Sequence, residues 1–413
     1  MARALHWLLP NEDRHYQWVI VSATVSNGGT SFYTMAAAIL AFHLTGQVSA
    51  SGTVFVWSLL PRLILLLVGG VIGDRYDRRD LLFRLDLLAA AVTLAPLFVV
   101  NASQLWILYA TGFVLNVLSC IYRPSQSALV RQLAGPEHVQ SAITDFNIWA
   151  QQLASIIGPL LAWPLLILIG PVEGFVVNAL SFVASALIIG QVPRGKWSEG
   201  RTETVIGTLA GYVHILRRRP RVFSVCLASI GACVPIFYFQ GIAVVYAVHL
   251  GQPSSFITVL FAVAAFGGLV GGLVVKVVPL TPKISAFCLI AAIPTWALLS
   301  YTSWAVVALL VVVVTTVFDN AGEIAFDVLI QKAVPDAEQA RLASVFMWFY
   351  AIGQIAGVLI VTLIDTAQAV SGMAPVALGS TLLSLSALAP LFLASTVPIE
   401  HVLAEEEMHI VST

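Results

Sequence analysis

Residues 66–85 read LLVGGVIGDRYDRRDLLFRL, in which a short basic turn separates two long apolar stretches. The apolar stretches cover residues 48–73 and 81–100, and each is close to the ~20 residues that an α-helix needs to cross a bilayer. Arginines in such turns stay on the cytoplasmic side during membrane insertion. The segment therefore predicts a helical hairpin whose turn faces the cytoplasm.

The same alternation of apolar stretches and short polar turns continues along the chain. The protein is 59% hydrophobic and only 10% charged, whereas soluble domains carry about 25% charged residues. We therefore expect an all-α membrane protein with twelve transmembrane helices. The twelve apolar stretches lie at residues 16–42, 48–73, 81–100, 104–125, 139–166, 173–190, 222–248, 254–278, 284–301, 304–326, 339–364 and 374–395.

The basic residues decide which ends of these helices face the cytoplasm. Of the 20 Lys and Arg residues, all but Arg62 lie in or beside the turns on one side of the predicted membrane. The turns on the other side contain none, and positive charge is retained in the cytoplasm. The sequence thus predicts a multi-pass protein of the cell inner (cytoplasmic) membrane with both termini in the cytoplasm. Because the bases set the topology and form no patch, no nucleic-acid partner is expected.

One long polar stretch interrupts the pattern near the middle of the chain and separates six predicted helices from six. We expect a first six-helix bundle over residues 1–190, a cytoplasmic linker over 191–221, a second bundle over 222–395 and a cytoplasmic tail over 396–413. Both bundles begin on the same side of the membrane, so any relation between them is a parallel repeat.

The two halves do resemble each other in sequence. Residues 129–159 align with residues 329–358 in a register that brings identical residues together, among them Gly158 and Gly357. A second similarity joins HLTGQ at 43–47 with HLGQ at 249–252. Two related six-helix bundles with a pathway between them are typical of secondary transporters.

The first cytoplasmic turn also carries a family resemblance. Residues 70–79, GVIGDRYDRR, resemble the signature G-x-x-x-D-R-x-G-R-R of the major facilitator superfamily, with Asp77 in place of the second glycine. Residues 158–162, GPLLA, are similar to the G-P-x-x-G motif of the family's drug antiporters. Residues 122–128, YRPSQSA, resemble the subgroup of enterobactin-type siderophore exporters and macrolide efflux pumps. The resemblance implies the major facilitator fold, with twelve helices in two pseudo-symmetric six-helix bundles.

This turn is a candidate gating element. Asp74 can accept hydrogen bonds from N–H groups at the start of a helix, where the helix dipole is positive. The resemblance implies residues 340–344, at the start of the eleventh helix, as its target, so that the contact holds the two bundles together while the inside is closed. A turn that serves topology alone is the alternative. The residues assigned to gating are Gly70, Asp74, Arg75, Arg78, Arg79, Arg123, Gly158 and Pro159.

Arg62 is the one Lys or Arg residue that lies away from the cytoplasmic turns, in the middle of a predicted helix. It follows Pro61, which loosens the helix, and lies about eleven residues, or roughly 16 Å, from the inner end of the second span. A cation there is unfavourable by at least ~2.5 kcal/mol on insertion scales, so it must face protein or water. One hypothesis is a counter-charge for an anionic substrate. The alternative is a structural partner for a buried carboxylate or for helix carbonyl groups.

Acidic residues recur every four positions in the tenth predicted helix, at Asp319, Glu323 and Asp327. Four residues advance by ~400°, so the three carboxylates form one stripe. Proton-driven antiport requires a membrane carboxylate that titrates, and we assign proton coupling to Asp319 and Glu323, with Asp145 as a further candidate. An interfacial charge ladder balanced by basic residues such as Arg123 is the alternative.

The helices that line the substrate cavity in the resembled fold contain further polar residues, namely Asn27, Asn116, Tyr238 and Gln240. Together with Arg62 they form the predicted substrate site. The sequence predicts a secondary active exporter that moves a small amphiphilic metabolite, with a siderophore favoured, in exchange for protons by alternating access.

Other functions are also compatible with these patterns. A multidrug or macrolide efflux pump is the closest alternative, followed by a lysolipid flippase or a transport-dead membrane sensor. The chain lacks a complete G-x-x-x-x-G-K-[ST] motif, because residues 190–196, GQVPRGK, are followed by Trp197. This argues against an ATP-driven pump. No enzyme activity, cofactor or metal is expected, the partners are a small-molecule substrate, protons and the lipid bilayer, and the protein is expected to be a monomer.

Overall fold

The computed structural model describes residues 14–65, 76–134, 150, 153–193, 220–277, 282–332 and 336–393. Within these ranges the chain forms twelve α-helices and no β-strand. Each helix coincides with one of the twelve apolar stretches, so the predicted all-α fold with twelve helices is confirmed. The helices are α2 (Arg14–Thr45), α3 (Val48–Leu65), α5 (Arg78–Thr93), α6 (Leu105–Ala134), α8 (Ala154–Ile169), α9 (Pro171–Ile189), α11 (Pro220–His249), α12 (Ile257–Val277), α13 (Pro282–Ala297), α14 (Ala305–Lys332), α15 (Asp336–Thr362) and α16 (Met373–Leu393).

The surface of these helices is apolar. Large aliphatic side chains are exposed in both halves of the chain, for example Leu168 (77%), Leu310 (61%) and Leu382 (69%). Exposed apolar surface of this extent needs a cover, and for helices of this length a bilayer supplies it. Six described segments are long and apolar enough to cross a membrane by themselves: Arg78–Phe98, Ala102–Ser127, Pro171–Ile189, Cys226–His249, Ser254–Val275 and Ala305–Gly322. The chain is therefore a multi-pass membrane protein.

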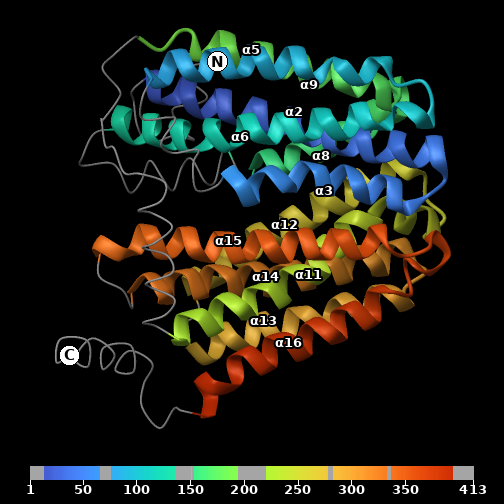
Figure 1. The fold of residues 1–413 in the computed structure, drawn as a ribbon, viewed down its shortest axis with the longest axis vertical. Helices are drawn as coiled ribbons and strands as arrows, with labels where there is room; N and C mark the ends of the chain where they lie inside the picture. The colour runs from blue at the N-terminus through green and yellow to red at the C-terminus, as the bar shows by residue number, and fades with distance from the viewer. Residues whose placement is uncertain are drawn as a thin grey trace. The chain divides into compact units, whose positions relative to one another are not determined.

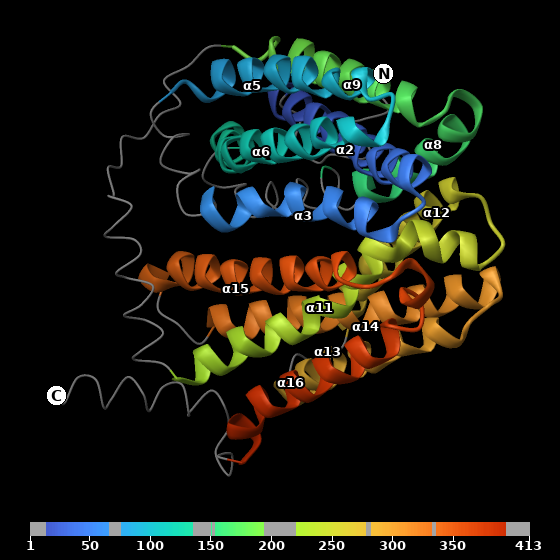
Figure 2. The same cartoon turned by 45° about the vertical axis from the view of Figure 1, so that its right-hand side comes forward.

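The chain divides into two compact units by its backbone contacts. The first consists of Met1–Glu203 with Pro253–Ala265, and the second of Thr204–Gln252 with Phe266–Thr413. Within each unit the helices lie side by side with roughly parallel or antiparallel axes (Figures 1 and 2). The start of α12 packs with the first unit, where Phe261 stacks on Phe55 of α3 with ring centroids 6.3 Å apart.

Helix α2 is the centre of the first unit and packs against α3, α6, α8 and α9. Glycines permit this close approach. A Cβ added to Gly29 would lie 2.7 Å from Asn178 Oδ1 of α9, and one added to Gly158 of α8 would lie 2.9 Å from the carbonyl oxygen of Gly28. Small residues at such contacts let membrane helices pack closely. Gly158 and Pro159, which the sequence assigns to gating, are both buried in this part of the unit.

Helix α11 holds the corresponding place in the second unit, where it packs against α13, α15 and α16. A Cβ added to Gly357 of α15 would lie 2.9 Å from the backbone nitrogen of Tyr238, and one added to Gly353 would lie 2.7 Å from the carbonyl oxygen of Ile230. Gly357 is the residue that the sequence repeat pairs with Gly158. Both members of the pair therefore bring a helix against the central helix of their own unit.

The second sequence similarity marks a left-handed glycine just beyond the central helix of each unit. Gly46 follows α2 and Gly251 follows α11, and both have a φ of 68°. Glycine reaches this left-handed conformation without the steric penalty that a Cβ brings, and it commonly ends helices in this way. The Gly46 N–H donates to the carbonyl oxygen of Phe42 at 2.7 Å, and the Gly251 N–H donates to that of Val248 at 2.9 Å.

Candidate functional site

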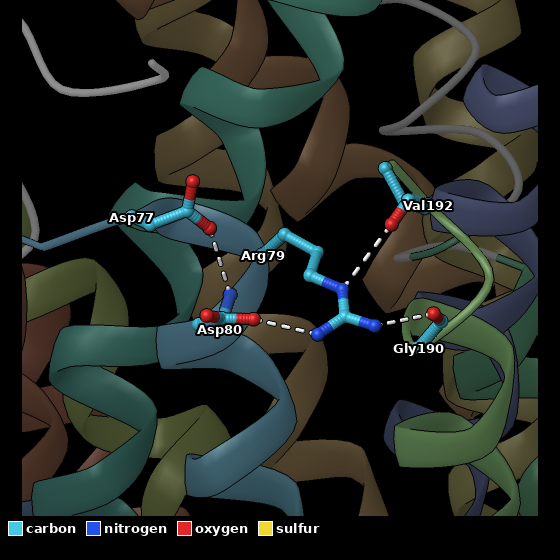
Figure 3. Close-up of polar contacts among 5 residues, drawn as sticks. All are labelled: Asp77, Arg79, Asp80, Gly190 and Val192. Carbon is cyan, nitrogen blue, oxygen red and sulfur yellow. Dashed lines mark hydrogen bonds and ion pairs between the residues drawn. The ribbon is translucent and has the colours of Figure 1, made fainter. Parts of the chain in front are cut away.

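The turn that resembles the family signature leads into α5, and Arg79 at the start of this helix reaches the end of α9 (Figure 3). Its Nε donates to the carbonyl oxygen of Val192 at 3.2 Å, its Nη2 donates to that of Gly190, and its Nη1 lies 2.6 Å from Asp80 Oδ1. The last carbonyl groups of a helix carry partial negative charge and lack partners within the helix. The guanidinium group therefore closes the end of α9 and ties it to the start of α5.

Asp77 caps α5 at the position where the family signature has glycine. Its Oδ1 accepts a hydrogen bond from the backbone N–H of Asp80 at 3.0 Å, which is the usual role of aspartate before a helix. Arg78 is buried, with 5% of its surface exposed. Outside the described residues lie the other gating residues predicted for this turn, namely Gly70, Asp74 and Arg75. The gating contact of Asp74 thus stays a prediction.

Two arginines of neighbouring helices come together in the first unit. Arg62 is half-buried near the end of α3, and Arg123 is exposed in α6. Their charges act on each other and on the thiol of Cys120, three residues before Arg123. Within the described part of the chain, Arg123 makes no hydrogen bond and no ion pair. Two residues that the sequence assigned to different tasks, substrate binding and gating, are therefore electrostatic neighbours.

A buried carboxyl group is the third feature of this unit. Asp86 of α5 is only 1% exposed, and its Oδ2 accepts hydrogen bonds from Ser185 Oγ of α9 at 2.7 Å and from Tyr122 Oη of α6 at 3.1 Å. Ser185 Oγ is 2.7 Å from Ser22 Oγ of α2, and Gln126 Nε2 donates to Tyr122 Oη at 3.3 Å. Side chains from four helices thus form one polar cluster around Asp86.

The sequence analysis missed Asp86, although a signal was present. An acidic residue inside a predicted membrane span is rare and marks a functional position more often than not, and Asp86 lies within the stretch 81–100. Its partners Tyr122 and Ser185 are 36 and 99 residues away in the chain. No local pattern joins residues at such separations, so the cluster is visible only in the folded chain.

The other predicted substrate residues lie in both units. Asn27 of α2 donates from Nδ2 to the carbonyl oxygen of Ala150 at 2.6 Å, and Asn116 donates to a carbonyl group one turn earlier in α6 at 3.0 Å. Tyr238 is fully buried in α11, and its hydroxyl donates to the carbonyl oxygen of Ala369 at 2.7 Å. These three side chains are thus already engaged with the backbone of their own unit.

The remaining candidates are described only in part. Gln240 of α11 and Asp319 of α14 are both half-buried. The side chain of Glu323 and the whole of Asp145 lie outside the described residues. Of the residues predicted to couple protons, Asp319 is thus the one whose side chain the structure describes.

Comparison with known proteins places these features in a family. The family model described as Major Facilitator Superfamily matches residues 19–358. Two proteins of Bacillus subtilis (strain 168) are similar. The uncharacterized MFS-type transporter YfiS is 26% identical over 229 residues, which are 54% of this chain and 53% of YfiS. The uncharacterized MFS-type transporter YkuC is 23% identical over 220 residues, 50% of this chain and 51% of YkuC. The chain thus spans about half the length of these curated relatives.

Solved structures share the fold over nearly the whole chain. A bacterial homologue of the human lysosomal transporter Spinster, in an inward-facing and unoccupied conformation, aligns with a TM-score of 0.68 and 15% identity over 96% of this chain and 99% of that chain. The nucleoside transporter NupG aligns with a TM-score of 0.73 and 13% identity over 91% of this chain and 99% of that chain. At these identities the likeness concerns the fold. The match of the family model over residues 19–358, with the twelve helices and this shared fold, shows that the chain belongs to the Major Facilitator Superfamily.

Proposed function

We propose that this protein is a secondary active exporter that moves a small amphiphilic anion of the siderophore class out of the cytoplasm in exchange for protons. The observation that carries the proposal is the pair of arginines, Arg62 of α3 and Arg123 of α6. A cation within the membrane, as Arg62 is predicted to be, is unfavourable by at least ~2.5 kcal/mol on insertion scales, so such an arginine marks a substrate or ion pathway.

Two neighbouring guanidinium groups favour a negatively charged ligand. Arg62 is half-buried and Arg123 is exposed. Their repulsion is still stronger near a protein surface than in bulk water, because the effective dielectric constant is lower there, and an anion beside both of them offsets it. The planar fork of arginine binds a carboxylate through two parallel hydrogen bonds, which a lysine cannot do. Siderophores present carboxylate or catecholate groups on a bulky body, so their chemistry matches this pair.

Sequence features support the direction of transport and its coupling to protons. Residues 122–128, which include Arg123, resemble exporters, and Asp319 supplies a carboxyl group in α14 that can exchange a proton. Asn116 and Gln240, both half-buried, are proposed as neutral contacts of the substrate. We place the protein in the cell inner membrane as a monomer with both termini in the cytoplasm, as its basic residues predict.

Uptake into everted membrane vesicles under an imposed pH gradient, acid inside, tests the proposal with a tri-catecholate siderophore as the probe. The wild-type protein should accumulate the probe. Arg62→Gln and Arg123→Gln should each weaken its binding about tenfold or more, because a hydrogen bond to a charged group contributes roughly 1.5–3 kcal/mol. Both variants should leave a neutral amphiphile of similar size nearly unaffected, and Arg62→Lys should recover only part of the binding.

Arg84→Gln is the matched control, since Arg84 is exposed on α5. The proposal fails if the wild type does not accumulate the anion, or if the arginine variants lose anionic and neutral compounds equally. Accumulation of a macrolide in place of the siderophore would assign the protein to multidrug efflux. If Arg62→Gln alone does not fold, Arg62 is a structural residue and Arg123→Gln remains the test.

A further inference from the structure

We propose that Asp86 is a proton-binding site in the interior of the first unit, positioned by the hydroxyl groups of Ser185 and Tyr122. It is separate from the first cytoplasmic turn and from the acidic residues of α14. Proton binding by Asp86 is a property of the protein alone. Its use to drive transport rests on the proton-coupled export proposed above.

The hydrogen bonds leave one oxygen of Asp86 free to carry the proton. Both bonds end on Oδ2, and within the described part of the chain Oδ1 accepts none. A proton on Oδ1 therefore leaves both bonds intact, with Oδ2 as the carbonyl oxygen of the acid. Because Ser185 and Tyr122 donate their hydroxyl protons to Asp86, their oxygen atoms act as acceptors. Ser185 Oγ then accepts from Ser22 Oγ, and Tyr122 Oη accepts from Gln126 Nε2. Chains of this kind reinforce one another and hold the carboxyl group in one orientation.

The helices packed around Asp86 present hydroxyl groups to it and no cation. Helix α6 presents Tyr122, which is the one titratable side chain in contact with Asp86, α9 presents Ser185, and α2 presents Ser22 behind Ser185. Arg123 follows Tyr122 in α6 but is exposed, so it lies on another face of that helix.

The charged groups farther along these helices are distant or engaged elsewhere. Glu173, the one acidic or basic residue of α9, lies twelve residues before Ser185 and is exposed at the opposite end of the helix. On α5, Arg79 and Asp80 bind each other at the start of the helix, and Arg84 is exposed. Arg78 is buried but lies at the first position of α5, eight residues before Asp86. On α2, Arg14, His15 and Tyr16 lie six to eight residues before Ser22.

This environment makes the charge state of Asp86 sensitive to packing. Burial removes the hydration of the carboxylate and disfavours the charged form, whereas the two hydroxyl donors favour it. Among the described residues no cation decides the balance. Burial and hydrogen bonding thus act in opposite directions on the carboxyl group of Asp86. A shift of the four surrounding helices changes both effects, so it can make Asp86 gain or lose a proton. Proton-coupled transport requires a group with this property.

The two sides of the cluster differ in polarity. Toward the end of the unit that carries Arg79 lies an apolar cluster that includes Ile20, Leu82 and Ile189, one helical turn or less from Ser22, Asp86 and Ser185. In the other direction along α2 and α9 lie Ser26 and Asn178, both buried. Asn178 Nδ2 has no hydrogen-bond partner in the described part of the chain. The buried side chains on this second side are therefore more polar than those on the first.

Infrared difference spectroscopy of the purified full-length protein in lipid tests the proposal without any substrate. Between about pH 4 and about pH 9, the wild type should show the C=O band of a protonated, non-aqueous carboxyl group that changes with pH. Asp86→Asn should lose this band. Asp365→Asn should keep it, because Asp365 is exposed in a loop and supplies a matched carboxyl group outside the helices.

Variants of the partners provide a second measurement in case Asp86→Asn does not fold. Tyr122→Phe and Ser185→Ala each remove a hydrogen bond that the carboxylate accepts, so the band should disappear at a higher pH than in the wild type, by about one pH unit. Identical spectra in the wild type and Asp86→Asn, or an unshifted band in both partner variants, would overturn the proposal. Neither result bears on siderophore uptake, so failure of this proposal is distinguishable from failure of the proposed function.

Discussion

Replacing a carboxylate by its amide changes little except the ability to titrate, so it isolates the role of a single proton. Asp319 is half-buried in α14 of the second unit. If α14 couples transport to protons, Asp319→Asn should abolish accumulation of substrate against its gradient and leave expression and ligand binding largely intact. Uptake into everted vesicles measures the first effect, and ligand binding to purified protein measures the second.

Asp365→Asn is again the matched control, since it removes an exposed carboxyl group from a loop. Normal pH-driven uptake by Asp319→Asn would remove Asp319 from the coupling mechanism. Uptake by Asp86→Asn in the same vesicles then assigns the coupled proton to α14 of the second unit, to α5 of the first, or to both.

Arg79 connects the start of α5 to the end of α9, so its removal should lower the stability of the protein. Arg79→Ala removes two hydrogen bonds to the carbonyl groups of Gly190 and Val192, just after α9, and the ion pair with Asp80. The carbonyl groups lose a charged partner, so we expect a destabilisation of about 2 kcal/mol. The thermal midpoint Tm of the purified protein in detergent should fall accordingly.

Arg84→Ala is the control for this change, because Arg84 belongs to the same helix but is exposed. Its Tm should stay within error of the wild type. An Arg79→Ala protein as stable as Arg84→Ala would show that the contact between the start of α5 and the end of α9 contributes nothing measurable to the fold.

In both units, a glycine allows a neighbouring helix to pack closely against the central helix. Gly158 of α8 and Gly357 of α15 each approach the backbone of the central helix of their unit so closely that a methyl group finds no room. Gly158→Ala and Gly357→Ala should therefore each destabilise the protein by roughly 1–3 kcal/mol, the usual effect of overpacking. Because backbone atoms form the contact, rotation of a side chain cannot relieve it.

Gly379 of α16 provides the control, since a Cβ added there meets nothing within 4 Å. Gly379→Ala should be neutral or slightly stabilising, because alanine is the better helix former by about 1 kcal/mol. Measurement of Tm for the three variants checks both expectations. Equal Tm values for all three would contradict the view that these glycines are needed for close packing.

The amino-acid sequence by itself determined the twelve helices, because hydropathy and charge act over segments of about the length of one membrane span. It also showed the similarity of residues 43–47 and 249–252, in which the structure places a left-handed glycine at Gly46 and at Gly251. The resemblance of a ten-residue turn identified the family that the comparisons then showed.

Only the tertiary structure decided which polar side chains meet. It brought Arg123 within electrostatic range of Arg62, joined Arg79 to the residues that end α9, and surrounded Asp86 with hydroxyl groups from helices far along the chain. Hydropathy reports how apolar a segment is, but not which face of a helix contacts which neighbour. Those contacts follow from the close packing of complete helices through small residues, and that packing exists only once the whole unit has formed.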